Sequence, residues 1–421
     1  VAQETVNRSS VPTWGRKLQT QRLAVRAYAV ASDDGFQVMD GALGRVTKDL
    51  SPLEISIRKG EMSKDVWVLS DKPVDHVSLL SQSGLGMPLR RSGADLPSRV
   101  ADNLFWLGRR LERTEDHARL LGITAKRLIG ELSYDELQDM PMLLRCLGAE
   151  GLIEPGYAMQ EMRATLPNIA LELANSIYAT QPDSLASGID NLVRLGYLVR
   201  DRLSAEGWQI IQRLEANFRQ QERRRLSLAD LVEGMNELQT LLAAFTGIVI
   251  EGMTRTQVFQ FLDLGRRIER SHQILGVLNH GILDETISSR VELETTLEWF
   301  QSLMTYRARY LSKVHEAGVL VLVVSDETNP RSLAYQIMKA KQHIDQLPRV
   351  DDAKSGYSPE ERAVAQLLSE VQTLSADEVT QVRGQKNIVQ RWAREVTALA
   401  NSISHRYLVH AKSRHISDFG G

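Results

Sequence analysis

The sequence predicts a mainly α-helical protein: a multi-helix bundle with internal duplication, preceded by a small β-rich N-terminal segment. First, alternating runs rich in Val, Ala and Tyr give way near residue 95 to helical periodicity. Second, a charged string occurs twice, as LGRRLER at 107–113 and as LGRRIER at 264–270. Third, strand patterns are almost absent after residue 95. These observations predict three regions: 1–80, a linker at 81–95 and a helical domain at 96–421.

Composition and charge are those of an ordinary globular protein. Of the 421 residues, 43% are hydrophobic and 25% are charged, which suffices for a sizeable core. The net charge of −2 gives no general attraction to nucleic acid, and no apolar run approaches the roughly 18 residues of a membrane span. The single cysteine, Cys146, excludes an intramolecular disulfide. We expect a cytoplasmic protein without a nucleic-acid or membrane partner, and a homo-oligomer is one open alternative.

The first 80 residues read as strands and turns. The runs at 22–30, 36–46 and 65–70 are alternating or apolar, and SDDG at 32–35 is a turn. A unit this small with many sheet edges is expected to be marginally stable alone. The stretch at 81–95 is rich in Gly, Ser and Pro and is typical of a linker. The chain starts at Val1 without a signal-peptide pattern, and we interpret it as a piece of something longer.

Beyond the linker we expect one helix after another. The first begins at Ser98, which we expect to be its N-cap. The apolar run in 319–332 fits either a strand or a buried helix end. The further helices are expected at 135–148, 157–179, 184–204, 206–219, 227–247, 254–279, 285–314, 330–345, 358–374 and 384–412.

The two charged strings lie on amphipathic helices, and a helical wheel places their glycines at equivalent positions. Gly108 borders the apolar stripe of the first helix, and Gly265 takes the same place in the second. Because a missing side chain lets another helix approach closely, we predict that the two helices pack through these glycines. A looser third copy at 190–204 adds to the case for duplication.

The charged residues of both strings lie on or beside the apolar stripe. Arg109 and Glu112, like Arg266 and Glu269, are three residues apart and are expected to bond within their own helix. A carboxylate beside a core needs a partner, because burying it alone is costly. One interpretation is an ion-pair lattice that fixes how the helices cross. The other is a ligand cleft, for which the acid/base candidates are Glu112, Glu115, Glu269 and His272.

Two further segments are candidates for ligand binding. TYRARY at 305–310 carries arginines among tyrosines on a helix, with simple packing as the alternative. DETNPRSL at 326–333 precedes a helix whose first N–H groups could accept an anion, with a capping turn as the alternative. Including the charged strings, the candidate ligand-binding residues are Arg109, Arg113, Arg266, Arg270, Arg307, Asn329 and Arg331.

The usual catalytic signatures are missing from the sequence. It has no G-x-x-x-x-G-K-[ST] and no G-x-S-x-G. Its histidines never have the H-x-x-x-H or H-E-x-x-H spacing of zinc sites, so no metal is expected. Cys146 has no adjacent base and is typical of a small core residue.

Four strings in order carry a resemblance to a known family: SRVADNLFWLGRRLERTEDHARLL, MTRTQVFQFLDLGRRIER, MTYRARY and SDETNPRSLAYQI. Together they resemble the alpha-E family, whose helical domains are named for a Glu-Arg motif. The match runs from about 96 to 421, and the family's biochemical activity is poorly defined.

The N-terminal part is similar to the C-terminal end of the circularly permuted ATP-grasp family, on LAVRAYAV, GFQVMDGALGRV and GEMSKDVWVLS. This resemblance implies an amidoligase context, in which an ATP-grasp enzyme activates a carboxylate as an acyl phosphate and an amine attacks it. A phosphate- or substrate-facing role is implied for the matching positions, which are Arg26, Arg45, Lys64 and Asp65. Because only the tail of such an enzyme is present, ATP and Mg²⁺ are implied only together with the missing core. The chain alone is expected to bind no cofactor.

Three functions stay open from the sequence. The first is an accessory helical domain beside an amidoligase, which binds substrate, a protein partner or the missing upstream ATP-grasp portion. The second is an enzyme in its own right, with Arg and Glu of the duplicated string lining a cleft. The third is a purely structural or oligomerising bundle. They differ in whether the two charged strings meet around a cavity or around each other.

Overall fold

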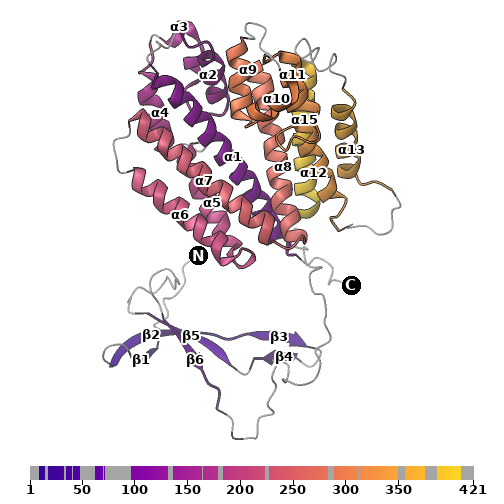
Figure 1. Cartoon of the computed structure of the whole chain (residues 1–421). Coiled ribbons are helices and arrows are strands. Elements are labelled where there is room, and N and C mark those ends of the chain that lie inside the picture. The colour runs from indigo at the N-terminus through magenta and orange to yellow at the C-terminus, as the bar shows by residue number, and fades with distance from the viewer. Residues whose placement is uncertain are drawn as a thin grey trace. The chain divides into compact units, whose positions relative to one another are not determined.

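The computed structural model of this chain contains two compact units, Val1–Arg90 and Arg91–Gly421 (Figure 1). The predicted linker at 81–95 lies outside the described residues, so its prediction stays a prediction. The structure describes residues 9–14, 18–32, 35–39, 41–47, 62–69, 71, 96–130, 136–163, 165–178, 184–222, 227–282, 289–311, 313–348, 356–374 and 386–408.

The N-terminal unit is built from antiparallel strands, as the alternating sequence predicts. A four-stranded sheet has the order β1 (Ser10–Trp14), β2 (Leu18–Arg26), β5 (Ala42–Thr47), β6 (Met62–Val66). A separate hairpin pairs β3 (Ala29–Ser32) with β4 (Gly35–Val38). Gly35 has φ +123°, a backbone conformation that side chains disfavour, so glycine suits the predicted turn.

Many apolar side chains of the N-terminal unit are uncovered. Trp14, Phe36 and Trp67 are 76%, 79% and 85% exposed. Val46 is the buried aliphatic side chain at the centre of the sheet. So many large exposed apolar side chains on a small unit are typical of a surface that another protein covers.

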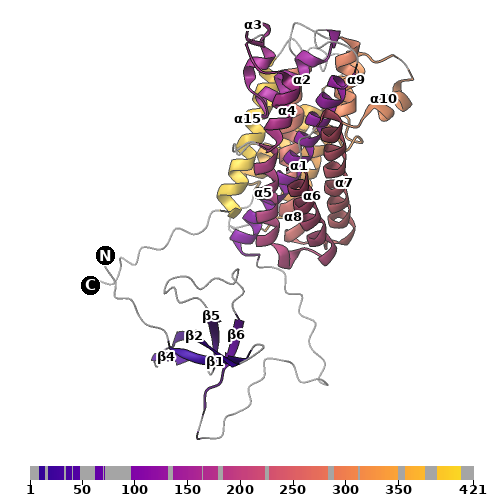
Figure 2. The same ribbon diagram turned by 90° about the vertical axis from the view of Figure 1, so that its left-hand side faces the viewer.

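The helical unit places long helices side by side and gathers short ones at one end (Figures 1 and 2). Two long helices, α1 (Ser98–Leu128) and α8 (Gln257–Val277), pack on each other at its centre. The other elements are α2 (Met140–Ala149), η3 (Pro155–Ala158), α3 (Gln160–Arg163), α4 (Ile169–Tyr178), α5 (Leu185–Leu198), η4 (Arg200–Arg202), α6 (Ala205–Glu222), α7 (Leu228–Gly252), η5 (Leu278–Ile282), α9 (Arg290–Trp299), α10 (Leu303–Tyr310), α11 (Glu316–Leu320), η6 (Val321–Ser325), α12 (Leu333–Ile344), α13 (Pro359–Gln372), α15 (Lys386–Ile403) and η8 (Ser404–Leu408).

Serine caps determine where several of these helices begin. The side chains of Ser184, Ser227, Ser289 and Ser332 each accept a hydrogen bond from the backbone N–H three residues later. Such caps satisfy donors that the first helical turn leaves unpaired. The expected cap at Ser98 is wrong by one residue: Pro97 holds the cap position, and Ser98 is already helical.

Two of the predicted long helices are interrupted. The helix expected at 157–179 is broken, and α4 begins two residues after Pro167, which cannot continue a helix. The helix expected at 285–314 ends at Trp299 and resumes at Leu303. Between them Gln301 has a left-handed backbone with φ 51°. The apolar run in 319–332 is a buried helix end, formed by α11 and the π-helical turn η6.

The core of the helical unit is continuous and includes large aromatic side chains. Trp299, Trp392, Tyr157 and Phe105 are at most 2% exposed. Cys146 is 3% exposed, in line with its interpretation as a small core residue. α1 also packs on α5 and α7, and α8 also packs on α12 and α15. The two charged strings therefore lie in the middle of the unit.

Candidate functional site

α1 and α8 cross with their backbones in contact at two glycines. A Cβ at Gly108 would lie 2.0 Å from the carbonyl oxygen of Leu262, and one at Gly265 would lie 2.1 Å from that of Phe105. No side chain fits at such distances, so both positions require glycine. The predicted packing through Gly108 and Gly265 is confirmed, and it brings the two charged strings face to face.

The ion pairs at this crossing run between the helices. Glu112 of α1 is bonded by Arg266 at 2.7 Å and by Arg270 at 2.6 Å, both of α8. In return, Glu269 of α8 is bonded by Arg109 at 2.6 Å and by Arg113 at 2.5 Å, both of α1. The expected pairing within each helix is therefore wrong. Since the backbones touch, the arginines of the opposite helix reach each carboxylate with good geometry.

Burial and charge act in opposite directions on these groups. Both glutamates are 2% exposed. Burial alone would raise the pKa of Glu269, but the guanidinium groups of Arg109 and Arg113 outweigh it and lower that pKa. Similarly, burial would lower the pKa of Arg266, yet Glu112 and other carboxylates raise it. Glu269 is consequently ionised, and Arg266 protonated, near neutral pH.

One side of the crossing is rich in arginine. We call it the Glu115 side, and it consists of Glu112, Glu115, Arg119, Arg266, Arg270 and Arg331. Glu115 accepts from Arg119 at 2.7 Å and from Arg331 at 3.2 Å. Arg331 also donates to the side chain of Gln301 at 2.5 Å. Burial would raise the pKa of Glu115, but Arg331, Arg270 and Arg119 outweigh it and lower the pKa to about 2. Burial and the charge of Arg270 lower the pKa of Arg331 to about 10. Arg331, predicted from the segment before α12, thus joins the charged strings.

The other side, which we call the His272 side, carries acidic groups and imidazoles. His117 lies 3.3 Å from Glu150. Burial lowers the pKa of His272. Asp116 accepts a hydrogen bond from the indole of Trp299 at 2.7 Å. Burial and the neighbouring carboxylate of Glu150 raise the pKa of Asp116 to about 7.

Several buried polar residues were missed by the sequence reasoning. Asp263 accepts from Arg267 at 3.0 Å and lies 2.8 Å from Nε2 of His343. Arg127 joins Asp139 and Glu298 in a second network. The only sequence signal was the density of charge within helices that also carry many apolar residues, such as ERTEDHARLL.

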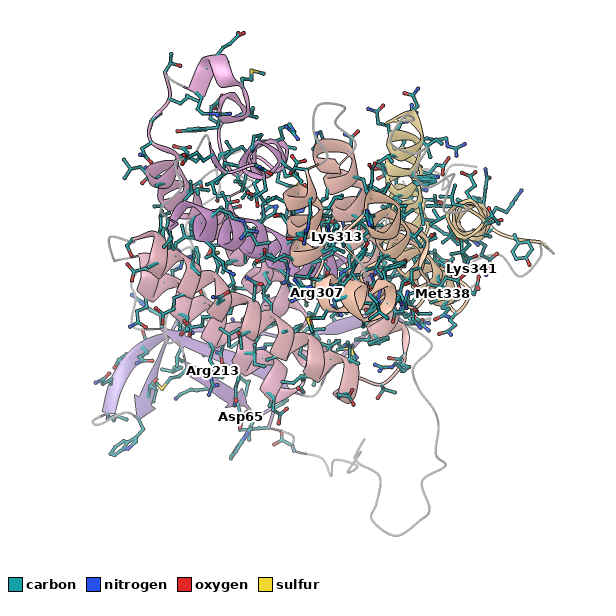
Figure 3. All side chains as sticks on the ribbon, turned by 45° about the horizontal axis from the view of Figure 1, so that its top comes forward. Asp65, Arg213, Arg307, Lys313, Met338 and Lys341 are labelled. Carbon is teal, nitrogen blue, oxygen red and sulfur yellow. The ribbon has the colours of Figure 1, made fainter. Side chains whose placement is uncertain are left out.

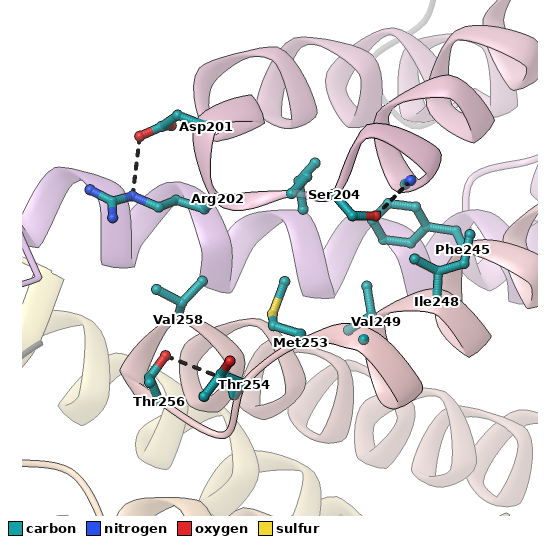
Figure 4. A pocket seen from close by; sticks show the side chains of 13 residues that line it. Asp201, Arg202, Ser204, Phe245, Ile248, Val249, Met253, Thr254, Thr256 and Val258 are labelled. Carbon is teal, nitrogen blue, oxygen red and sulfur yellow. Dashed lines mark hydrogen bonds and ion pairs between the residues drawn. The ribbon is translucent and has the colours of Figure 1, made fainter.

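Two cavities lie elsewhere in the helical unit. One of about 300 Å³ lies where α6 begins, α7 ends and α8 begins, with Ser204, Phe245 and Thr256 among its lining residues (Figure 4). The other, of about 400 Å³, lies beside the Asp263 network and includes Arg267 and Tyr335. None of the four acid/base candidates lines either cavity. The charged strings meet around each other, as the ion-pair interpretation predicts.

The remaining predicted residues of the helical unit have different surroundings. Arg307 is exposed on α10 (Figure 3). Asn329 is 4% exposed and donates to the carbonyl of Leu322 at 2.9 Å and to Ser302 at 3.2 Å. Its side-chain amide oxygen, Oδ1, accepts from the backbone N–H of Arg331 at 3.1 Å. Asn329 therefore shapes the turn before α12 and positions Arg331.

The sheet brings three of its four predicted residues to one face. Arg26 lies opposite Leu43 in the register, and Leu43 lies opposite Asp65. Directly opposite residues share a face, and Arg45, two residues along β5, points the same way. Lys64 lies on the other face and donates to the carbonyl of Pro12.

Within the described residues, the structure contains no helix long and apolar enough to cross a membrane. The same part of the chain has no group of three or more His, Cys, Asp or Glu side chains suited to a metal ion.

A family model described as "a predicted alpha-helical domain with a conserved ER motif" matches residues 96–408. Two of the four Glu-Arg steps in the sequence, at 112–113 and 269–270, lie in the two strings that cross. The chain is 28% identical over 404 residues to uncharacterized proteins of Mycobacterium tuberculosis and Mycobacterium bovis. The match covers 91% of this chain and 44% of theirs, so the chain spans less than half the length of these relatives. No solved structure matches it. The family model covers most of the chain, and the chain therefore belongs to the alpha-E family of helical domains.

Proposed function

We propose that this chain is an accessory helical domain that works beside an ATP-grasp amidoligase and docks onto it through the N-terminal unit. The observation that carries the proposal is the set of large apolar side chains exposed on that unit. Trp14, Phe36 and Trp67 are each more than three-quarters exposed. Covering each of these rings stabilises a complex by about 2–3 kcal/mol.

The occupant that we assign to this surface is the body of an ATP-grasp ligase. The sheet residues resemble the last segment of such an enzyme, and a segment of a larger sheet is expected to have uncovered apolar side chains. This chain matches 44% of the length of its relatives, so more than half of each relative remains for a further domain such as a ligase body. Arg26, Arg45 and Asp65 share one face, which supports a polar face directed towards a substrate.

We assign ATP and Mg²⁺ to the ligase body and not to this chain. Two arginines of the sheet could face a phosphate. The described residues offer no acidic cluster suited to Mg²⁺, so we derive no catalytic step through either group here.

The helical unit supports the accessory role through its closed charge clusters. Glu112 and Glu269 are each held by two arginines. The arginines lower the pKa of Glu269, so this carboxylate is not available as a proton donor near neutral pH. An enzyme in its own right is the second candidate. The specific observation in its favour is Asp116, whose pKa is raised by burial to about 7, in the range that suits general acid–base catalysis.

The test is a reconstitution with an ATP-grasp amidoligase from the same organism. We expect the chain alone to release no ADP from ATP. We expect a 1:1 complex by sedimentation and a change in the amine-dependent rate of ADP release when the ligase is added.

Matched variants locate the contact. Trp67→Asp should abolish complex formation, whereas Met304→Asp, at an apolar residue 73% exposed on α10, should not. Absence of a complex with the unchanged chain would overturn the proposal. Substrate turnover by the chain alone, lost in Asp116→Asn, would favour the second candidate instead.

A further inference from the structure

The charges on the Glu115 side of the crossing do not balance. Four arginines lie within electrostatic reach of two glutamates there. The glutamates are Glu112 and Glu115. The arginines are Arg119, Arg266, Arg270 and Arg331. Asp263 lies 3.5 Å from Arg266 but also pairs with Arg267 at 3.0 Å. Counting both adds one negative and one positive charge, so the surplus stays the same.

The arginines of this side also keep N–H groups that no protein atom accepts. Arg119 donates only through Nη2, to Glu115, and the Arg331 side chain donates only through Nη2, to Glu115 and Gln301. Among the described atoms, Nε and Nη1 of both residues are neither bonded to protein nor fully buried. A guanidinium group has five N–H donors, so most of them remain available.

These donors are sheltered and yet accessible from outside. The side chains of Arg119 and Arg270 are each 10% exposed, and that of Arg331 is 24% exposed. Surplus positive charge in such surroundings is unfavourable unless an anion accompanies it, because little water is present to solvate it. The lowered pKa of Arg331, caused by burial and by Arg270, agrees with this crowding of like charges.

We propose that the Glu115 side binds a small oxyanion, either a carboxylate or a phosphate group, between Arg119, Arg270 and Arg331. The planar guanidinium fork matches the spacing of oxygens in both groups. The three arginines come from α1, from α8 and from the turn before α12, so the folded helical unit preorganises the site. Glu115 accepts from Arg119 and Arg331 through one oxygen and fixes their separation. This inference goes beyond the accessory role and does not depend on the ligase.

The test uses the full chain with two probes, inorganic phosphate and succinate, each compared with chloride at the same ionic strength. We expect at least one probe to raise the melting temperature above the chloride control and to give a measurable dissociation constant by calorimetry. The probe that binds identifies the source of the oxyanion, and binding of both identifies a general oxyanion site.

Two variants make the inference falsifiable. Arg331→Gln should weaken probe binding by about tenfold or more, the effect of one lost charged hydrogen bond. In chloride alone it should melt at or above the unchanged chain, because it relieves surplus positive charge. Arg119→Gln provides the same measurement if Arg331→Gln fails to fold. The control Arg290→Gln, at an arginine whose side chain is 61% exposed, should leave binding unchanged. The site would be refuted if the unchanged chain had the same melting temperature in phosphate, succinate and chloride. It would also be refuted if Arg290→Gln weakened probe binding as much as Arg331→Gln does.

Discussion

The two sides of the α1–α8 crossing share their central geometry and differ in what surrounds it. On both sides a buried glutamate is held by two arginines of the opposite helix. The Glu115 side adds Arg119 and Arg331, whereas the His272 side adds Glu150, Asp116 and two imidazoles. The reciprocal pairs therefore serve the crossing itself, and the added residues determine how each side differs chemically.

The largest expected loss of stability comes from a substitution that separates the two helices and so disrupts both sides of the crossing. Gly108→Ala places a Cβ against the carbonyl oxygen of Leu262, 2.0 Å away, and the backbone cannot move aside cheaply. We expect the free energy of unfolding to fall by about 5 kcal/mol. Gly247→Ala is the control, because a Cβ there meets nothing within 4 Å, and it should stabilise α7 by about 0.5–1 kcal/mol. Urea unfolding followed by circular dichroism measures both, and similar curves for the two variants would contradict the crossing.

The next prediction compares the two central glutamates directly. Glu269→Ala leaves two arginines without their carboxylate and should cost about 3–5 kcal/mol, whereas Glu294→Ala, in an exposed pair with Arg290, should cost less than about 1 kcal/mol. Glu112→Ala should cost more than Glu269→Ala, because its arginines already lie among surplus positive charge. Denaturant titration at low and high salt ranks the three. If Glu269→Ala unfolds like the unchanged chain and only a ligand is lost, the cluster is a binding site instead of a structural one.

The smallest expected effect concerns pH on the His272 side. The pKa of Asp116 rises from 3.8 to about 7 on burial, so between these values the unfolded chain releases a proton that the folded chain keeps. Asp116 therefore lowers stability as pH rises through this window, and the loss persists above about pH 7. Asp116→Asn removes this contribution and should melt at a higher temperature than the unchanged chain at about pH 8. The free energy of unfolding should rise by up to about 4 kcal/mol at that pH, and by less at about pH 5.

The pH test depends on the difference in melting temperature between Asp116→Asn and the unchanged chain at each pH. Glu115, with its pKa lowered to about 2, acts in the opposite direction, because its contribution is lost as pH falls below the usual range of a glutamate. Melting temperatures recorded across the pH range provide the measurement. A difference that stays constant with pH would show that Asp116 is ionised in the folded chain.

Features that depend on neighbouring residues in the sequence could be predicted, whereas features that depend on contacts between distant residues could not. Helical periodicity and the position of Gly108 beside the apolar stripe are local, so the helices and the close crossing were foreseen. The partners of Glu112 and Glu269 depend on a contact between residues far apart in the chain, and local spacing suggested the wrong bonds. The helix break at Gln301 could not be predicted from its residue type, because the packing around it imposes its left-handed backbone. Asp116 could not be singled out, since its raised pKa comes from burial beside Glu150, another long-range contact.

The exchange of partners at the crossing has a consequence for how the chain folds. Each of the two helices holds the counter-ions of the other, so neither can be completed by its own neighbours in the sequence. A fragment with α1 alone would lack the two arginines of α8 that pair with Glu112. A fragment with α8 alone would lack the two arginines of α1 that pair with Glu269. We therefore expect α1 and α8 to become stable together, although a long stretch of chain separates them, because each supplies the arginines that hold the buried glutamate of the other.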